Sequence, residues 1–507
     1  MDLILFFVIM SVVIFAYFQH NPIGHGSRFI WRRFINWFPL GMTYAFLYMA
    51  RYNLSVSKNA LGNAMSKEDF GLIFGAGTVI YGFSFLLNGP LVDKMGGKKG
   101  IIIAALGACL ANVAMGMSLY LFLHDRLPFN LTLTFAILYS VNMFFQSYGA
   151  VSIIKVKAYW FHVRERGIFG AIFGTLISFG VYFAFDWGQA IVEASKAKIE
   201  GEPTRLQKVF QALFAIDTHQ TDALWLVFFI PSAILVFWAL MDMWLIKDTP
   251  SQANFEDFDT HDASSGEMDK EFTMYELLHK VFSSKIMLVV ACIEFTSGVL
   301  RNGILQWYFI FAKEVPQGSS EFFIKHWGML VCLVGIIGGF AGGIVSDKFF
   351  HSRRGPPAAI AQAIMLLATI VMAIYLLTDP TIVGVCALVI SCLVISVHSL
   401  MSGTAAADFG GRKATATASG IVDGFVYLGS GLQSVALGYL TTQDWRFWPV
   451  FMSPFALAGM FLALRIWKDL PEATRKYLVH VEKLVTVKTT DGRTIISERS
   501  EEDFEVS

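Results

Sequence analysis

Two arginines lie inside apolar segments of this chain, where a charge is costly. Arg51 belongs to LYMARYNLSVS and Arg301 to FTSGVLRNGILQW. An arginine at the centre of a membrane helix costs about 2.5 to 3.5 kcal/mol on insertion scales. Because a planar guanidinium forms paired hydrogen bonds with phosphate, two such groups predict an anion site. A fixed acid is the alternative partner for either arginine alone, and Glu294, seven residues before Arg301, could bridge to Arg51.

Two further titratable residues lie in apolar segments. Asp423 shares a helical stripe with Ser419 and Tyr427, and His398 lies in VISVHSLMS. A carboxylate surrounded by hydrocarbon must either bind a proton or pair with a cation, and both suit proton coupling. Asp423 could equally form a hydrogen bond between helices, and a structural role is the favoured interpretation of His398. Glu294, His398 and Asp423 are therefore candidates for coupling or for ion pairs.

The composition indicates the solvent around these residues. Of 507 residues, 55% are hydrophobic and 15% are charged, and the mean hydropathy is +0.56. A soluble protein has about a quarter of its residues charged, so this chain is predicted to lie in a lipid bilayer. The 39 basic and 39 acidic residues cancel, which points to no nucleic-acid partner. The sequence contains no P-loop, metal-ligand cluster or nucleophile motif, so we expect no enzyme activity, cofactor or metal.

Apolar runs of about 18 or more residues predict the helices that position these side chains, because each run can cross about 30 Å of hydrocarbon. One run lies over residues 1–20 and lacks the basic leading region and cleavage site of a signal peptide. Twelve more form a main block, at 35–57, 70–92, 100–123, 130–154, 167–192, 223–247, 284–312, 326–346, 357–378, 380–407, 414–440 and 447–468. The predicted fold class is all-α integral membrane, with one extra N-terminal transmembrane helix.

Basic residues of the short loops orient this block. Twelve Lys and Arg fall in loops placed inside and six in loops placed outside, so both ends of the twelve-helix block are predicted to be cytoplasmic. The polar segment 248–283 is predicted to be a central cytoplasmic loop between six-helix halves at 35–247 and 284–468. The polar tail at 469–507 is predicted to be a cytoplasmic appendage that does not pack alone.

The two halves repeat each other. GPLVDKMGGKK and GIVSDKFFHSRR each join the second and third helices of a half, and their aspartates are 254 residues apart. Arg51 and Arg301 are 250 residues apart and so occupy near-equivalent positions. We assign gating roles to the residues of the two loop motifs: Gly89, Asp93, Lys94, Gly343, Asp347 and Lys348.

This repeat predicts where the two arginines lie. Duplicated halves place a binding site between them near the membrane midplane, where Arg51 and Arg301 would face each other. At ~10 Å and an effective dielectric of ~20 they would repel by about 1.7 kcal/mol. A bound dianion would turn that repulsion into attraction.

Several motifs together resemble a known family. RYNLS, VRERG, KDTP, RNGILQW and KATATASGIVDGFVYLG are similar to the organophosphate:phosphate antiporters of the major facilitator superfamily, which include glycerol-3-phosphate and hexose-phosphate transporters. The resemblance covers roughly residues 35 to 470. It implies a major facilitator fold of two pseudo-symmetric six-helix halves that work by alternating access. It also implies that substrate phosphate is bound by Arg51 and Arg301 near four tyrosines, each of which could instead be a packing residue: Tyr44, Tyr48, Tyr81 and Tyr427.

Three positions depart from the family pattern. Phe85 stands where close relatives have a lysine, Leu176 where glycerol-3-phosphate transporters have a histidine, and Gln306 where relatives often have an acid. The loss of two possible cations and one anion counts against an ordinary small sugar phosphate as the substrate.

The expected protein is a monomeric secondary transporter of the bacterial inner membrane. It would exchange an organic phosphate, or a similar small organic anion, for inorganic phosphate. A sugar-phosphate sensor and a proton-coupled transporter of another anionic metabolite remain alternatives.

Overall fold

The computed structural model describes most of the chain. The described residues are 2–162, 165–196, 203–214, 222–258, 260, 276, 279, 283, 285–315, 320–350, 353–409, 411–468, 485–488 and 494–497. Within these ranges the side chains of residues 2, 166–168, 170, 171, 347, 403–419, 485–488 and 494–497 lie outside the description.

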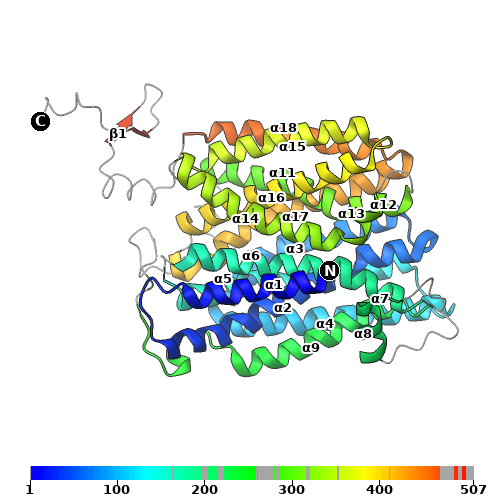
Figure 1. Ribbon diagram of the computed structural model, residues 1–507, viewed down its shortest axis with the longest axis horizontal. Helices are drawn as coiled ribbons and strands as arrows, with labels where there is room; N and C mark the ends of the chain where they lie inside the picture. Colours follow the sequence, from blue (N-terminus) through cyan, green and yellow to red (C-terminus); the bar gives the residue numbers. More distant parts are fainter. Residues whose placement is uncertain are drawn as a thin grey trace, which may run out of the picture.

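Long helices lie side by side and form one bundle (Figure 1). Helices before residue 250 lie mostly below those after residue 284 in this view. The helices of the bundle are α2 Ser27–Leu61, α3 Lys67–Met95, α4 Gly97–Leu123, α5 Leu131–Trp160, α6 Arg166–Tyr182, α7 Gly188–Ala194, α9 Leu226–Leu245, α11 Lys285–Leu305, α12 Trp307–Glu314, α14 Trp327–Phe350, α15 Gly355–Tyr375, α16 Pro380–Phe409, α17 Gly411–Gln443 and α18 Phe447–Arg465. Shorter elements are η1 Gly62–Ala64, α8 Arg205–Leu213, η4 Ser251–Ala253 and α13 Glu321–Lys325.

Each of the twelve predicted spans falls on these helices. In the described part of the chain, eleven helices are long and apolar enough to cross a membrane. The first predicted span lies on α2, which is not among the eleven. Polar residues explain this, because Arg33, Asn36, Arg51 and Asn53 are all buried along α2 and lower its hydropathy.

The fifth predicted span is interrupted. A π-helical turn, η3 Phe183–Trp187, separates α6 from α7. Asp186 lies in this turn, and its carboxylate accepts hydrogen bonds from the backbone N–H groups of Gly328 at 2.8 Å and Met329 at 3.0 Å. These groups belong to the first turn of α14, where N–H groups lack partners within the helix. The π-turn, a feature often associated with functional sites, therefore connects a helix of the first half to one of the second.

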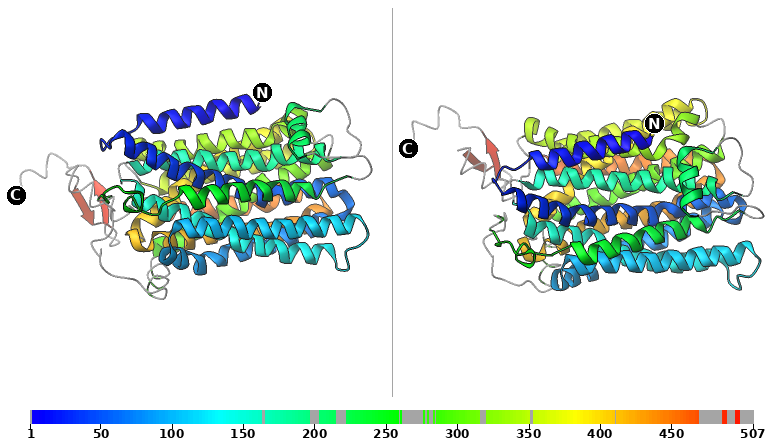
Figure 2. Two further views of the ribbon diagram at one scale, coloured as in Figure 1. Left: turned by 90° about the horizontal axis from the view of Figure 1, so that it is seen from below. Right: turned by 60° about the horizontal axis from the view of Figure 1, so that its bottom comes forward.

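The extra N-terminal helix is α1 Asp2–Gln19, which lies along the outside of the bundle (Figure 2). Phe6 packs against Phe179 and Phe183, with ring centroids 4.8 and 5.5 Å apart. The hydroxyl of Tyr17 donates to the carbonyl oxygen of Ile30 at 3.0 Å. With 18 residues, α1 is about 27 Å long, close to the minimum length for a membrane span.

The tail contains two short strands, which the sequence-based fold class did not include. Strand β1 Val485–Lys488 pairs antiparallel with β2 Thr494–Ser497, and Val485 lies opposite Ser497. Valine, threonine and isoleucine favour extended backbone, and they make up most of both segments. That the tail is a cytoplasmic appendage stays a prediction.

Glycines allow two helices from different halves to approach closely. A β-carbon placed on Gly82 of α3 would lie 2.8 Å from the carbonyl oxygen of Gly424 on α17. The two backbones therefore touch without side chains between them, as small residues permit in membrane helices. This contact brings Tyr81 of α3 against Tyr427 of α17, with ring centroids 4.2 Å apart.

Replacing Gly82 with alanine should lower the free energy of unfolding by about 1–3 kcal/mol, because the added methyl group forces α3 and α17 apart. Gly339 in α14 is a matched control, since a β-carbon there would meet no neighbour within 4 Å. Thermal unfolding of both variants in one detergent measures the difference. Equal midpoints for Gly82→Ala and Gly339→Ala would show that the α3–α17 contact does not limit stability.

Candidate anion-binding site

Arg51 is the centre of the site and is fully buried. From α2, its Nε donates to Gln146 Oε1 on α5 at 3.0 Å, and its Nη1 donates to the Tyr427 hydroxyl on α17 at 3.0 Å. The second terminal nitrogen, Nη2, has no hydrogen-bond partner among the described residues. Because both partners are neutral, the protein holds a buried cation in place and leaves one of its donors available to a ligand.

Tyrosine rings surround the Arg51 guanidinium. Its central carbon lies 4.4 Å from the ring centroid of Tyr81, 4.8 Å from that of Tyr48 and 5.6 Å from that of Tyr427. Each cation–π contact of this kind contributes about 0.5–2 kcal/mol. The rings orient the cation but do not neutralise it.

Arg301 on α11 reaches the same tyrosines. Its Nη2 donates to the Tyr48 hydroxyl at 3.3 Å, and part of its side chain remains exposed. Tyr48 therefore contacts Arg51 with its ring and Arg301 with its hydroxyl. Tyr44 packs edge-on against Tyr48, with ring centroids 5.4 Å apart. The structure thus brings together the six residues that the family resemblance implied, from α2, α3, α11 and α17.

Three polar neighbours of this site were not identified from the sequence: Gln146, Tyr52 and Asn302. Tyr52 donates from its hydroxyl to Asn302 Oδ1 at 3.2 Å, which links α2 to α11. Gln146 follows Asn142 by four residues in an apolar segment. That helical spacing of two buried amides was a usable signal for a polar stripe on α5.

The three departures from the family pattern lie close to this site or among its supporting helices. Phe85 packs edge-on against Tyr81, with ring centroids 4.8 Å apart. Leu176 is buried against Gly41 of α2. Gln306 is buried at the break between α11 and α12, and neither its side-chain oxygen nor its nitrogen has a hydrogen-bond partner among the described residues. Apolar groups therefore occupy two positions where relatives carry possible cations.

A second group of titratable residues lies on α11, α16 and α17. Glu294 does not form the bridge to Arg51 that the sequence left open as an alternative, and its Oε2 lies 3.1 Å from His398 Nδ1 instead. Glu294 is seven residues from Arg301, or about 10 Å along α11, where α16 packs against this helix. Asp423 Oδ1 accepts a hydrogen bond from Ser402 Oγ at 3.1 Å.

The loop motifs assigned to gating lie at one end of the bundle, away from the arginines. Asp93 Oδ1 forms an ion pair with Lys155 Nζ at 2.9 Å, which joins α3 to α5. Gly89 is buried, whereas Lys94 and Lys348 are exposed. A β-carbon added to Gly343 on α14 would meet no neighbour within 4 Å, and the side chain of Asp347 lies outside the described residues. The gating role of these motifs stays a prediction.

The opposite end of the bundle carries ion pairs that join the two halves. Glu314 on α12 lies 2.6 Å from Lys58 Nζ on α2 and 3.1 Å from Lys67 Nζ on α3. Lys67 also donates to the carbonyl oxygen of Thr441 on α17 at 2.8 Å. We call this the Glu314 end and the other the Asp93 end. The contacts at the Glu314 end hold the halves together there.

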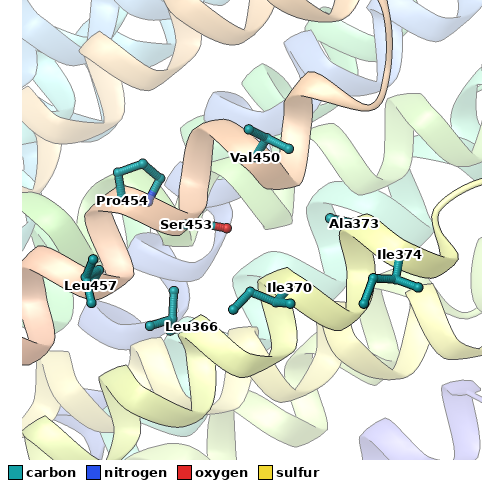
Figure 3. A pocket seen from close by; sticks show the side chains of 8 residues that line it. All are labelled: Leu366, Ile370, Ala373, Ile374, Val450, Ser453, Pro454 and Leu457. Atoms are coloured by element: carbon teal, nitrogen blue, oxygen red, sulfur yellow. The ribbon is translucent and has the colours of Figure 1, made fainter.

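An apolar hollow of about 560 Å³ lies between α15 and α18 (Figure 3). Its lining contains one hydroxyl and no charged side chain: Leu366, Ile370, Ala373, Ile374, Val450, Ser453, Pro454 and Leu457. Ile370, Ile374 and Val450 are exposed at the outer surface of the bundle. The hollow therefore suits lipid chains and offers no ligand for an anion.

Comparisons with known proteins agree with this architecture. The Glycerol-3-phosphate transporter of Bacillus subtilis is 24% identical over 448 residues, which cover 83% of this chain and 89% of that protein. The Membrane sensor protein UhpC of Escherichia coli is 25% identical over 441 residues, covering 86% and 91%. A solved structure of a bacterial homolog of the human lysosomal transporter Spinster, inward-facing and unoccupied, has a TM-score of 0.58 and 14% identity, covering 90% of this chain and 97% of that one. Residues 40–434 match the model of the Major Facilitator Superfamily, and the chain therefore belongs to that family.

Proposed function

We propose that this protein is a secondary transporter that carries an organic phosphate, or a similar small organic anion, across the bacterial inner membrane in exchange for inorganic phosphate. The observation that carries the proposal is the buried Arg51, whose Nη2 has no partner among the described residues and which shares Tyr48 with Arg301. The likeness to a glycerol-3-phosphate transporter supports the same substrate class.

The electrostatics favour a dianion as the ligand. A buried cation without an acidic partner is unfavourable, because its desolvation is not offset by a nearby negative charge. Two such cations in one site add mutual repulsion. A phosphate dianion neutralises both and offers oxygens to each guanidinium in the planar, paired geometry that arginine prefers. A monocarboxylate has only two oxygens and can form the paired geometry with only one guanidinium.

Alternating access assigns roles to the two ends of the bundle. The proposal places the Glu314 end outside and the Asp93 end, with both ends of the twelve-helix block, in the cytoplasm. Ion pairs across the Glu314 end close that side, and transport requires that they separate when the other side closes. One chain supplies both arginines, so a monomer contains a complete site.

Counterflow into proteoliposomes tests the proposal. Vesicles loaded with inorganic phosphate should accumulate external radiolabelled phosphate faster than vesicles loaded with chloride. Binding of phosphate without any counterflow would favour the alternative function, a sensor like the Escherichia coli relative. Absence of both binding and counterflow would contradict the proposed substrate class.

Replacing Glu314 with glutamine should open the Glu314 end more often, because Lys58 and Lys67 lose their shared carboxylate. Partly exposed ion pairs contribute about 0.2–1 kcal/mol, so labelling of a cysteine introduced at Ala60 should accelerate by about 1.4- to five-fold. Glu321→Gln, an exposed change on neighbouring α13, is the control. The measurement uses a background without the five native cysteines. An unchanged labelling rate would show that these ion pairs do not hold the end closed.

A further inference from the structure

We infer that Glu294, His398 and Asp423 form a proton-binding cluster that takes up protons when an anion binds between Arg51 and Arg301. This inference rests on the proposed function. Three different helices supply the cluster, and none of its members contacts Arg51 in the way that a purely structural ion pair would require. The geometry, the burial and the charge balance of the site each support it.

The geometry places the cluster one or two helical turns from the anion site. Glu294 lies seven residues before Arg301 on α11, and Asp423 lies four residues before Tyr427 on α17. The Tyr427 hydroxyl accepts one of the hydrogen bonds from Arg51. His398 Nδ1 lies 3.1 Å from Glu294 Oε2, and an imidazole can carry a second proton on its other ring nitrogen. An anion bound between the arginines therefore changes the electrostatic potential at the cluster.

Burial makes a fixed charge on Glu294 unfavourable. Glu294 is fully buried, and its Oε1 has no hydrogen-bond partner among the described residues. A buried carboxylate oxygen without a donor costs free energy that a proton on the carboxyl or on the imidazole would offset. The His398 side chain is 27% exposed and Asp423 is partly exposed, so protons can reach both. Protonation would therefore lower the free energy of the cluster, and protons can exchange with solvent through the partly exposed His398 and Asp423.

The charged groups around the cluster are few. Arg301 faces it from α11, and Arg51 faces the adjoining site from α2 together with Tyr48 and Tyr427. Helices α15 and α18, which pack against α11 or α16, carry no acidic residue and only Arg465 at the end of α18. Helix α14 carries Asp347 and Lys348 only near its end. Among the side chains that the structure describes, no acid forms a hydrogen bond or ion pair with either arginine.

The charges balance only in particular protonation states. With a neutral His398, two arginines and two carboxylates sum to zero when no ligand is present. A bound dianion changes this sum by two negative charges. One proton on His398 and one on a carboxyl group would restore neutrality, so anion binding and proton binding strengthen each other by linkage. Exchange of organic phosphate for phosphate remains possible, because both ligands would draw the same protons.

Isothermal titration calorimetry of inorganic phosphate in buffers of different ionisation enthalpy measures protons taken up per bound anion. The intact protein should take up about two protons per bound anion, and a variant that has lost one titrating group about one fewer, since linkage ties proton binding to anion binding. His398→Gln, Asp423→Asn and Glu294→Gln should each reduce this number, and their phosphate affinity should fall as a consequence. Glu321→Gln, which is exposed and far along the chain from the cluster, should match the parent. Phosphate can itself gain or lose a proton when it binds. This contribution is the same for the parent and the variants, so it cancels in the difference between them.

Difference infrared spectroscopy of the unmodified protein provides a second readout if a variant fails to fold. Addition of phosphate should increase the signal of a protonated carboxyl group or of an imidazolium. Equal proton uptake in the parent and in all three folded variants, with phosphate still bound, would overturn the inference and leave the proposed function intact. No spectral change on phosphate binding would also overturn it. Failure of the parent to bind phosphate would instead contradict the proposed function.

Discussion

Replacing Arg51 with lysine should weaken the binding of inorganic phosphate by about 10- to 100-fold. Lysine keeps the charge but loses the planar fork, so it cannot hold Gln146 and Tyr427 while it also donates to a ligand. Hydrogen bonds to charged groups contribute about 1.5–3 kcal/mol, and each 1.4 kcal/mol is a factor of ten in affinity. The same argument applies to Arg301→Lys, which loses the hydrogen bond to the Tyr48 hydroxyl.

Calorimetric titration of the purified variants with phosphate measures this effect, and thermal unfolding reports whether each variant is folded. Arg446→Lys is the matched control, because Arg446 is exposed in the turn before α18. A folded Arg51→Lys protein that binds phosphate as tightly as the control would show that Arg51 is a structural residue. The same result for Arg301→Lys would remove that arginine from the site.

Replacing Glu165 with glutamine should lower the free energy of unfolding by about 3–5 kcal/mol, the usual loss when one partner of a buried ion pair is removed. Arg33 donates from Nη1 to Glu165 Oε2 and from Nη2 to Oε1, both at 2.9 Å. Their side chains are only 1% and 2% exposed. The backbone N–H of His162 also donates to Glu165. Without the carboxylate, the charge of Arg33 stays buried and loses its ion pair with Glu165.

The same ion pair predicts a dependence of stability on pH. Burial alone would raise the pKa of Glu165, but the nearby His25 and the paired Arg33 lower it to about 2. A glutamate in an unfolded chain has a pKa of about 4.3. The ion pair therefore contributes its full stabilisation above about pH 5 and loses it as the pH falls toward 2, because the unfolded state then binds the proton more readily.

Thermal unfolding between neutral pH and pH 4 compares the parent with Glu165→Gln. The difference between their midpoints should be largest near neutral pH and should begin to narrow at the acid end. Glu321→Gln provides the control for loss of an exposed carboxylate. A loss of less than about 1 kcal/mol at neutral pH, or a difference that does not change with pH, would contradict this account.

The sequence by itself determined the membrane environment and the approximate positions of the long apolar helices. Hydropathy is a property of each segment and requires no knowledge of its neighbours. The repeat of the loop motifs around Asp93 and Asp347 also revealed two related halves. From that repeat, Arg51 and Arg301 could be expected at matching depth. The family match over residues 40–434 confirms the fold that the family resemblance implied.

Tertiary structure decided which groups meet these side chains. Glu294 contacts His398 rather than Arg51, because helix spacing specifies a face but not the helix that packs against it. Gln146 accepts a hydrogen bond from Arg51 only because α5 lies beside α2 at that depth. The close approach at Gly82 and Gly424 places Tyr81 and Tyr427 against each other. Rotation and separation of packed helices depend on contacts between distant segments, and hydropathy carries no information about them.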